Sequence, residues 1–301
     1  MRIEQVGPGY AVCADSAEAG TRAQIRQLTG DVPLIIADPP YGNILKHTRW
    51  DSVGDDEENF VNWMLSWTRM WTDMVLPGGA LYVWGGIGTP GFRPFFRYLA
   101  DVEKRFNDVR LANLITWSKK RAYGVKHNYL FTREELAYFC KGDIKKPRCF
   151  NIPLLETKRG YAGYNAKYPA KSEFYRRTNV WTDITEIMQG KVHDAQKKQR
   201  VMEIPIEVHT KLGEWVVDPF AGSGTTALAA MKLGRRFVVI EKDEQEFEKM
   251  LERLRTHVVN EQKHEVVLSH GHNAEADQDQ GHQDERCEDQ AQVALCGSVD
   301  G

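Results

Sequence analysis

The sequence predicts an α/β fold with a parallel sheet, and three observations support this prediction. A strand pattern at residues 9–16, a helical pattern at 17–28 and a buried-strand pattern at 33–37 follow one another, in about the thirty residues of a βαβ unit. Near the other end, a strand at 215–218 leads through a turn and a helix to a strand at 236–240. Each strand ends at an acidic residue, where open α/β sheets carry their chemistry. These acids are Asp15, Asp38, Asp218 and Glu241.

The segment Asp38-Pro39-Pro40-Tyr41 directly follows the buried strand. Two consecutive prolines fix their φ angles and donate no backbone hydrogen bond, so the turn is stiff and its carbonyls stay free to accept. A carboxylate, a free carbonyl and an aromatic ring held in this way suit a planar group with an amine, such as a nucleobase. An ordinary strand end followed by a turn explains the same residues, so this motif alone does not decide the function.

Apolar side chains recur at helical spacing after the polar loop 43–55, behind the capping candidates Asp55 and Asp56. They are Phe60, Trp63, Met64, Trp67, Trp71 and Met74. A core-facing helix explains this stripe better than a platform for stacking bases. We expect Pro77-Gly78-Gly79 to end the helix.

The following segments continue the alternation of strands and helices. Strands are expected at 80–84, 111–117 and 136–140, and a helix with its apolar side at 92–102. The glycine-rich loop at 85–88 lacks the Lys-Ser or Lys-Thr of a phosphate-binding loop.

Two further segments carry local signals. Residues 118–123 are expected to form a basic turn, and residues 202–212 a helix broken or started near Pro205.

Periodicity is lost between Gly142 and about His193, where basic residues interleave with seven aromatic residues. Between residues 141 and 200, 14 basic side chains stand against 6 acidic ones. This combination suits a surface that neutralises phosphates and packs on sugars or bases. A solvated, irregular insertion is the alternative, although the segment is too long for an ordinary connection.

A second motif, Pro219-Phe220-Ala221-Gly222-Ser223-Gly224, leads into a helix at Thr225–Leu233 that Gly234 closes. Its glycines let the backbone approach a ligand, and the helix N-terminus suits a carboxylate or a phosphate, but the lysine of a phosphate loop is absent. Glu241 lies 19 residues beyond Gly222, near the ~20-residue offset of a ribose-binding acid. A ligand with both a carboxylate and a ribose is S-adenosylmethionine.

Composition excludes several classes of protein. The 301 residues are 42% hydrophobic, which suffices for one large domain with insertions or two small ones. No apolar run approaches the ~18–20 residues of a membrane helix, and the first residues do not resemble a signal peptide. The five cysteines show no Cys-x-x-Cys spacing, so neither disulfides nor a structural metal are expected. We therefore expect a cytoplasmic protein with no metal and no membrane partner.

Together, the motifs at 38–41 and 218–226 resemble those of the amino-methylating DNA methyltransferases of the β arrangement, in which the catalytic motif precedes the cofactor motif. The likeness spans roughly residues 10–257. It extends to Leu76–Leu81, Ile115–Lys119, Val180–Ile184 and His193–Lys197. The resemblance implies a Rossmann-like, S-adenosylmethionine-dependent methyltransferase sheet with a circularly permuted motif order.

The expected organisation has four parts. The catalytic half covers residues 1–141, an inserted target-recognition segment 142–192, and the cofactor-binding half 193–259. From residue 260, ten acidic side chains stand against two basic ones, which predicts a disordered tail whose histidines are solvated rather than metal-bound.

The resemblance also implies residue roles. Asp38 and the Pro39 carbonyl would accept both hydrogens of the target amine, next to Pro40, and Tyr41 would stack on the base. The implied cofactor-binding residues are Asp15, Asp218, Phe220, Gly222, Ser223, Gly224, Thr225, Glu241 and Lys197. Family members commonly have prolines on both sides of the Gln-Lys pair. Here Asp194 and Lys198 occupy those places, so local rigidity around Gln196 and Lys197 is expected to be lower than in those members.

The expected partner is double-stranded DNA, whose target nucleotide must be flipped out at a cost of a few kcal/mol. The basic residues expected to contact DNA are Lys119, Lys120, Arg121, Lys158, Arg159, Lys171, Arg176 and Arg177. A homodimer and a cognate restriction enzyme are further partners that the resemblance allows. Adenine N6 is the preferred target, because the family's cytosine N4 members more often carry serine in place of Asp38. The alternatives are cytosine N4, adenine in RNA, and a non-catalytic DNA-binding relative.

Overall fold

The computed structural model describes residues 1–41, 56–86, 88, 92–124, 126–127, 129–158, 172–185 and 197–263. The chain divides into two units, Met1–Leu254 and Arg255–Gly301. Residues 255–263 of the second unit are helical. The acidic tail is predicted to be disordered from residue 260. Residues 260–263 are helical, and the rest of the tail lies outside the described ranges. The sheet and the candidate site belong to the first unit.

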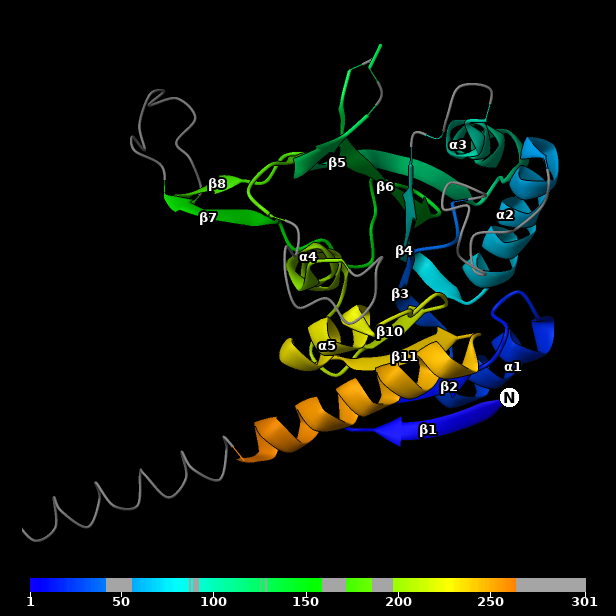
Figure 1. The fold of residues 1–301 in the computed structure, drawn as a ribbon, viewed down its shortest axis with the longest axis vertical. Coiled ribbons are helices and arrows are strands. Elements are labelled where there is room, and N and C mark those ends of the chain that lie inside the picture. Colours follow the sequence, from blue (N-terminus) through cyan, green and yellow to red (C-terminus); the bar gives the residue numbers. More distant parts are fainter. Residues whose placement is uncertain are drawn as a thin grey trace, which may run out of the picture. The chain divides into compact units, whose positions relative to one another are not determined.

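A mixed sheet organises the first unit (Figure 1). Its order in the described residues is β1-β2-β11-β10-β3-β4-β6-β5-β9. The strands are β1 Arg2–Val6, β2 Gly9–Cys13, β3 Val32–Ala37, β4 Val75–Gly85, β5 Val109–Tyr123, β6 Phe131–Lys141, β9 Val180–Trp181, β10 Trp215–Asp218 and β11 Arg236–Glu241. The strands from β2 to β4 run parallel, as predicted. The prediction is wrong for β1 and β6, which pair antiparallel with their neighbours because short hairpins return the chain beside the preceding strand.

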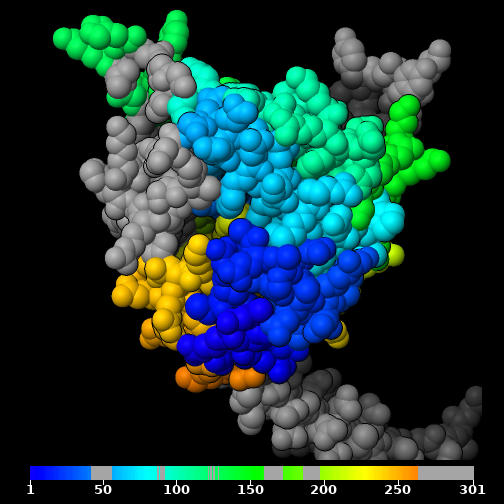
Figure 2. All heavy atoms as spheres, turned by 90° about the vertical axis from the view of Figure 1, so that its right-hand side faces the viewer, coloured from blue at the N-terminus to red at the C-terminus, as the bar shows by residue number. Residues whose placement is uncertain are grey.

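Helices cover both faces of the sheet. They are α1 Ala19–Thr29, α2 Glu57–Thr72, α3 Pro94–Arg105, α4 Gln199–His209 and α5 Thr225–Lys232, followed by a helix at 244–254. Helices α1, α2 and α3 lie on one side, and α4 and α5 on the other (Figure 1). Figure 2 views the first side, with the residues of α1 in blue and those of α2 and α3 in lighter blue to green.

Strand β3 is buried on both faces, which explains its continuous apolar sequence. Ile35 and Ala37 pack in the core cluster that also contains side chains of α1, α2 and α3. Because side chains alternate along a strand, Leu34 and Ile36 face the other side, where they are also fully buried. Strand β3 therefore lies in the middle of the molecule, and the residue that follows it, Asp38, lies at the middle of the sheet edge.

Helix α2 confirms the interpretation of the apolar stripe, since Phe60, Met64, Trp67 and Trp71 are buried in the core. The Asp56 carboxylate caps the helix by accepting a hydrogen bond from the Asn59 N–H at 2.8 Å.

The prediction that Pro77-Gly78-Gly79 ends α2 is wrong. The helix ends at Thr72, and the Pro-Gly-Gly segment lies inside β4. The pairing of β3 with β4 shifts register between Val32 and Leu34, so the segment forms a bulge in the strand rather than a helix stop.

Two other local predictions are wrong. Residues 118–123 continue β5, because pairing with β6 extends the strand beyond the apolar positions. Helix α4 runs through Pro205 without a break. Proline removes one backbone hydrogen bond, and the buried side chains of Val201, Ile204 and Val208 hold the helix on the sheet.

The described part of segment 142–192 contains short strands. Strands β7 (Leu154–Lys158) and β8 (Phe174–Arg176) form a separate antiparallel pair, and β9 joins the main sheet beside β5. Strands of two to five residues are too short to produce a clear periodicity, which explains why the sequence showed none. The limits of the four predicted parts stay a prediction.

Candidate active site

The four strand-end acids lie along one edge of the sheet. Strands β2, β11, β10 and β3 are parallel, so their carboxyl ends share that edge. Glu241 lies opposite Cys13, and Asp218 lies opposite Val239. Asp15 and Asp38 follow the ends of β2 and β3 within two residues. The structure thus brings together residues from both ends of the chain.

Each carboxylate oxygen of Asp38 contacts one side chain. The Tyr41 hydroxyl donates to Oδ1 at 3.0 Å, and Lys197 Nζ lies 2.6 Å from Oδ2. Lys197 also donates to the Tyr41 hydroxyl oxygen at 3.2 Å. The Lys197 side chain is 7% exposed and that of Asp38 20%. Three polar groups from two distant segments thus form one compact cluster.

Glu134 belongs to this cluster, and sequence reasoning missed it. Its Oε2 lies 3.2 Å from Lys197 Nζ, and its Oε1 accepts a hydrogen bond from Lys119. Glu134 is near the start of β6, whose antiparallel direction brings this end to the edge where β4 and β5 end. We expected the strand to begin at Leu136, so Glu134 looked like a loop residue. No local signal in the sequence could have shown its pairing opposite Trp117.

The four charges influence one another. Burial raises the pKa of Asp38, and the Lys197 ammonium opposes this rise. Burial disfavours the charge on Lys197, but the carboxylates of Asp38 and Glu134 outweigh it and raise the Lys197 pKa. Burial also disfavours the Glu134 carboxylate, yet Lys197 and Lys119 hold its pKa below the ordinary value. Asp38, Glu134, Lys197 and Lys119 together carry no net charge when all four side chains are ionised.

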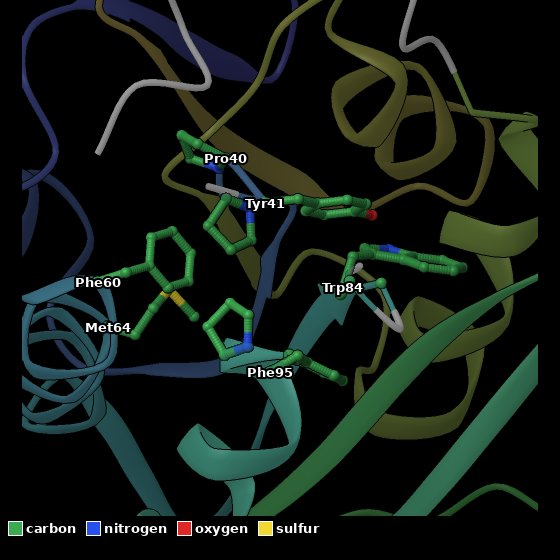
Figure 3. A pocket seen from close by; sticks show the side chains of 11 residues that line it. Pro40, Tyr41, Phe60, Met64, Trp84 and Phe95 are labelled. Carbon is green, nitrogen blue, oxygen red and sulfur yellow. The ribbon is translucent and has the colours of Figure 1, made fainter. Parts of the chain in front are cut away.

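A pocket lies beside the Pro39-Pro40-Tyr41 turn (Figure 3). The side chains leave about 10 Å³ in it for the centre of a water molecule, which is about the room one water needs, and the pocket is partly open to solvent. Figure 3 shows Tyr41 and Trp84 on one side and Phe60 and Met64 of α2 on the other. Lys197 Nζ lies 4.8 Å from the centre of the Trp84 ring and 5.6 Å from that of Tyr41, so the charged cluster adjoins the pocket. Aromatic walls of this kind favour stacking with a flat ring.

The second motif forms a turn between β10 and α5 that two acids hold in place. Asp218 accepts hydrogen bonds from the Phe220 N–H at 2.9 Å and from the Thr226 hydroxyl at 2.5 Å. Glu241 accepts the Gly222 N–H at 2.9 Å. Burial raises the pKa of Asp218 to about 7, against the effect of these hydrogen bonds, and burial also raises the pKa of Glu241.

The two glycines of this turn have different surroundings. Both adopt left-handed conformations, with φ of +48° at Gly222 and +75° at Gly224. A Cβ added to Gly224 would lie 2.8 Å from Cγ of Met250, whereas no atom of the described residues lies within 4 Å of one added to Gly222. Gly224 therefore allows helix packing, and the open space at Gly222 fits a ligand that approaches the backbone.

The remaining cofactor candidates have varied partners. The Phe220 ring packs against Trp67 with 5.0 Å between ring centres. The hydroxyls of Ser223 and Thr225 lie 3.2 Å apart and are buried. Asp15 pairs with Lys242 at 2.6 Å.

Lys197 is placed differently from the other candidates. Its described contacts are with the Asp38 cluster, not with the glycine turn. Its assignment to the cofactor, like the other roles, stays a prediction.

The basic residues expected to contact DNA differ in exposure. Lys120, Lys158 and Arg176 are exposed. Lys119 is partly buried and bonded to Glu134. Arg159, Lys171 and the side chain of Arg121 lie outside the described residues.

Arg177 does not occupy the surface position that the prediction requires. Its guanidinium is 4% exposed and donates to both carboxylate oxygens of Asp183, at 2.7 and 2.8 Å. It also lies 5.9 Å from the centre of the Trp181 ring. This bidentate pair holds the segment around β9 together, so a DNA contact by Arg177 does not fit the structure. A repeated Arg-Arg sequence gives no sign of which side chain points inward.

No group of three or more His, Cys, Asp or Glu in the described ranges is arranged to hold a metal ion. None of the helices in that part of the chain is both long and apolar enough to cross a membrane.

Known proteins resemble this chain over most of its length. The Type II methyltransferase M.BamHI of Bacillus amyloliquefaciens is 28% identical over 231 residues, which cover 70% of this chain and 50% of that protein. M2.DpnII of Streptococcus pneumoniae, also a Type II methyltransferase, is 27% identical over 227 residues, covering 70% of this chain and 78% of that protein. The match thus spans about half the length of M.BamHI and more of M2.DpnII.

Solved structures share the fold. The M1.HpyAVI–SAM complex matches with a TM-score of 0.54 at 23% identity, covering 81% of this chain and 98% of that one. The PvuII DNA methyltransferase, described as cytosine-N4-specific, matches with a TM-score of 0.61 at 17% identity, covering 85% and 94%. The family model for N6/N4 DNA methylases matches residues 32–252. The predicted Rossmann-like methyltransferase fold is confirmed, and the chain belongs to the N6/N4 DNA methylase family.

Proposed function

We propose that this DNA methylase transfers a methyl group from S-adenosylmethionine to N6 of adenine in duplex DNA. The observation that carries the proposal is the placement of the Asp38 carboxylate. It lies at the end of β3, beside an aromatic pocket, and β3 pairs directly with β10, whose end begins the glycine turn. An amine acceptor and a candidate cofactor site thus lie at neighbouring strand ends. S-adenosylmethionine supplies the methyl group as an electrophilic sulfonium.

Asp38 and the Pro39 carbonyl accept the two hydrogens of the adenine amine. Both bonds draw the nitrogen lone pair out of conjugation with the ring and orient it for in-line attack. Because the methylated ammonium is acidic, it loses its proton without a strong base. Tyr41 stacks on the adenine ring beside the pocket, and the stiff Pro39-Pro40 segment keeps ring and carboxylate in register.

The glycine turn binds the cofactor in this proposal. Phe220, Gly222, Gly224 and Thr225 line its methionine end, and Glu241 holds the ribose hydroxyls. The open space beside Gly222 supports this assignment. Asp15 meets the adenine amine of the cofactor. Asp218 shapes the turn by accepting the Phe220 N–H and the Thr226 hydroxyl, and Ser223 contributes through its contact with Thr225.

Duplex DNA is the proposed substrate. Exposed basic residues of β5, β7 and β8 lie in the part of the chain where phosphate contacts are expected. The hairpin between β5 and β6 stands out from the body in Figure 2, in green. Its described residues include the exposed Lys126, His127 and Tyr129. Such a projection can reach the backbone around a flipped nucleotide.

Adenine is favoured over cytosine because an aspartate stands at position 38, where cytosine N4 members of the family more often have serine. The fold shared with the cytosine-N4-specific PvuII enzyme does not change this preference, since 17% identity supports the fold and not the substrate.

The test is to incubate the purified protein with mixed-sequence duplex DNA and labelled S-adenosylmethionine, then digest the DNA to nucleosides for mass spectrometry. Label in N6-methyladenine is the expected result. Label in N4-methylcytosine would keep the mechanism and overturn the choice of base. No label in DNA, with cofactor binding intact in calorimetry, would overturn the proposed function in favour of an RNA substrate or a non-catalytic role.

The substitution Asp38→Asn tests the role of the carboxylate. Asparagine keeps the shape but is uncharged, so its oxygen is a weaker acceptor for the amine hydrogen and its NH₂ group can only donate. We expect turnover to fall at least 100-fold, corresponding to about 3 kcal/mol of transition-state stabilisation. The affinity for S-adenosylmethionine, measured by calorimetry, should change little. Loss of cofactor binding along with turnover would show that Asp38 belongs to the cofactor site instead.

A further inference from the structure

A chain of alternating charges runs through the candidate active site. Lys119 contacts Glu134, Glu134 contacts Lys197, and Lys197 contacts Asp38. Exposed fractions of these side chains lie between 7% and 23%. Ion pairs that are this well shielded from water interact more strongly than surface ion pairs. A buried charge that loses its partner destabilises the folded protein. The position of the Lys197 ammonium therefore affects two carboxylates at once, those of Asp38 and Glu134.

Asp38 is a strong acceptor for the amine hydrogen only while it is ionised, because protonation turns one carboxyl oxygen into a donor and leaves the other uncharged. Burial works against ionisation, and so does negative charge nearby. The groups that act on Asp38 are the Lys197 ammonium, the Glu134 carboxylate, the Tyr41 hydroxyl and, from β10, Asp218. Lys197 is the cation among these groups and lies 2.6 Å from Asp38. Its charge offsets the cost of keeping Asp38 ionised.

The same contact obstructs the reaction, since Lys197 occupies the Oδ2 oxygen of Asp38 and Tyr41 occupies Oδ1. An incoming amine must compete with the ammonium. Glu134 offers a second acceptor: its Oε2 is buried, lies 3.2 Å from Lys197 Nζ, and makes no aligned hydrogen bond within the described residues. A small movement of Lys197 would convert this ion pair into a hydrogen bond. Lys197 can then loosen its hold on Asp38 without becoming an unpaired buried charge.

We propose that Lys197 and Glu134 are positioning residues for the amine-accepting carboxylate. Lys197 keeps Asp38 ionised in the free protein, and it shifts towards Glu134 when the substrate amine binds. This inference rests on the proposed function for its catalytic consequence, and it assigns Lys197 to the methyl-acceptor side of the site rather than to the cofactor.

The first test is the pH dependence of kcat in Lys197→Met, with Lys197→Arg as the variant that keeps the charge. Removing a paired cation raises a carboxyl pKa by about 1 to 3 units. In Lys197→Met we expect the acidic limb of the profile to move up by at least about one unit. On the acidic limb we also expect kcat to fall about tenfold for each unit of this shift, and to recover at higher pH. Lys197→Arg should keep the limb in its original place.

A matched control is Lys249→Met, which removes a lysine from an exposed pair with Glu246 and should change nothing. An unmoved limb in Lys197→Met would overturn the proposal.

The second test is Glu134→Gln, with Glu135→Gln as the neighbouring control. Without the second carboxylate, Lys197 stays on Asp38 and competes with the amine. We therefore expect kcat to fall about tenfold (1.4 kcal/mol). The acidic limb should lie at or below its original pH, because the cation is retained and the Glu134 charge that raises the Asp38 pKa is lost. Glu135 contacts Arg133 and Thr116 instead of Lys197, so its variant should keep the original kcat. An unchanged kcat in Glu134→Gln would refute the sharing of Lys197, and this outcome can be read even if Lys197→Met does not fold.

Thermal unfolding separates this inference from the proposed function. If the protein transfers no methyl group, the ionic role of Lys197 is still measurable. Without its cation, the raised pKa of Asp38 makes folding less favourable as the pH increases. The Tm of Lys197→Met should therefore fall, relative to the parent protein, between pH 5 and pH 8, and Asp38→Asn in the same background should remove part of this fall. Parallel pH profiles of the parent and Lys197→Met would contradict the electrostatic role whatever the activity.

Discussion

Asp218 is a buried carboxyl group whose raised pKa makes its ionisation change near neutral pH. It is 3% exposed and accepts hydrogen bonds from Phe220 and Thr226. Burial raises its pKa to about 7, and the charges of Asp38 and Glu241 add to the rise. Burial raises the pKa of all three acids, Asp38, Asp218 and Glu241. The clustering of acids that serves ligand binding therefore carries a cost in stability.

The cost has a defined direction with pH. Because the folded-state pKa of Asp218 is raised, its favourable contribution is complete below about pH 4 and is lost as the pH rises through 7. Asp218→Asn keeps the shape and cannot ionise. Between pH 5 and pH 7 we expect the free energy of unfolding of the variant, minus that of the parent protein, to increase by up to about 1.4 kcal/mol per pH unit. Urea unfolding at pH 5, 6 and 7 measures this. A constant difference between the two proteins would show that Asp218 does not titrate in this range.

At the scale of elements, the turn between β10 and α5 contains one glycine that helix packing requires and one beside the proposed cofactor site. The two glycines share a left-handed backbone, but among the described residues a side chain would meet neighbours only at Gly224, namely Met250 and Leu254. The sequence pattern treats them alike. Their different surroundings predict different consequences for the same substitution.

Gly224→Ala should lower the free energy of unfolding by about 1–3 kcal/mol, because of the strained φ angle and the contact with Met250. Gly222→Ala should cost less stability but weaken S-adenosylmethionine about tenfold or more, because its methyl group enters the space proposed for the cofactor. Urea unfolding and calorimetry on both variants provide the comparison. Equal losses of stability with unchanged cofactor affinity would place the ligand elsewhere.

Strand β8 and the residue after it provide another matched pair. Arg176 is exposed, whereas Arg177 is bonded to Asp183. Arg176→Ala should weaken DNA binding and reduce the slope of log affinity against log salt by about one. Arg177→Ala should instead lower stability, since it leaves a partly buried carboxylate without its partner. Fluorescence anisotropy over a salt series, together with thermal unfolding, distinguishes the two. If Arg177→Ala changed only the salt slope, its guanidinium would have to leave Asp183 and reach DNA.

At the scale of the whole molecule, the chain divides at residue 254 into a unit that carries the sheet and a second unit. The family match ends nearby, at residue 252. Ending the chain after Lys263 removes most of the acidic residues that follow position 260. We expect this truncation to leave Tm and kcat unchanged, as measured by calorimetry and by the methylation assay. A clear drop in Tm would mean that the removed residues contact the folded unit.

The sequence determined the parts of this protein that depend on local chemistry. Buried strands show as apolar runs, so the parallel centre of the sheet could be predicted, and β10 was predicted with its observed limits. The rigid turn after Asp38 and the glycine turn after Asp218 follow from the backbone properties of proline and glycine. Their order along the chain sufficed to predict the family.

Only the tertiary structure decided how distant side chains meet. The antiparallel direction of β6 brings Glu134 to the catalytic edge, and the start of α4 brings Lys197 to Asp38. The burial of Arg177 and the continuation of β5 likewise depend on partners elsewhere in the chain. The sequence of one strand reflects how well each residue suits an extended backbone and whether it favours burial or solvent. It does not contain the direction or register of the neighbouring strand, because these are set by packing and hydrogen bonding across the whole sheet.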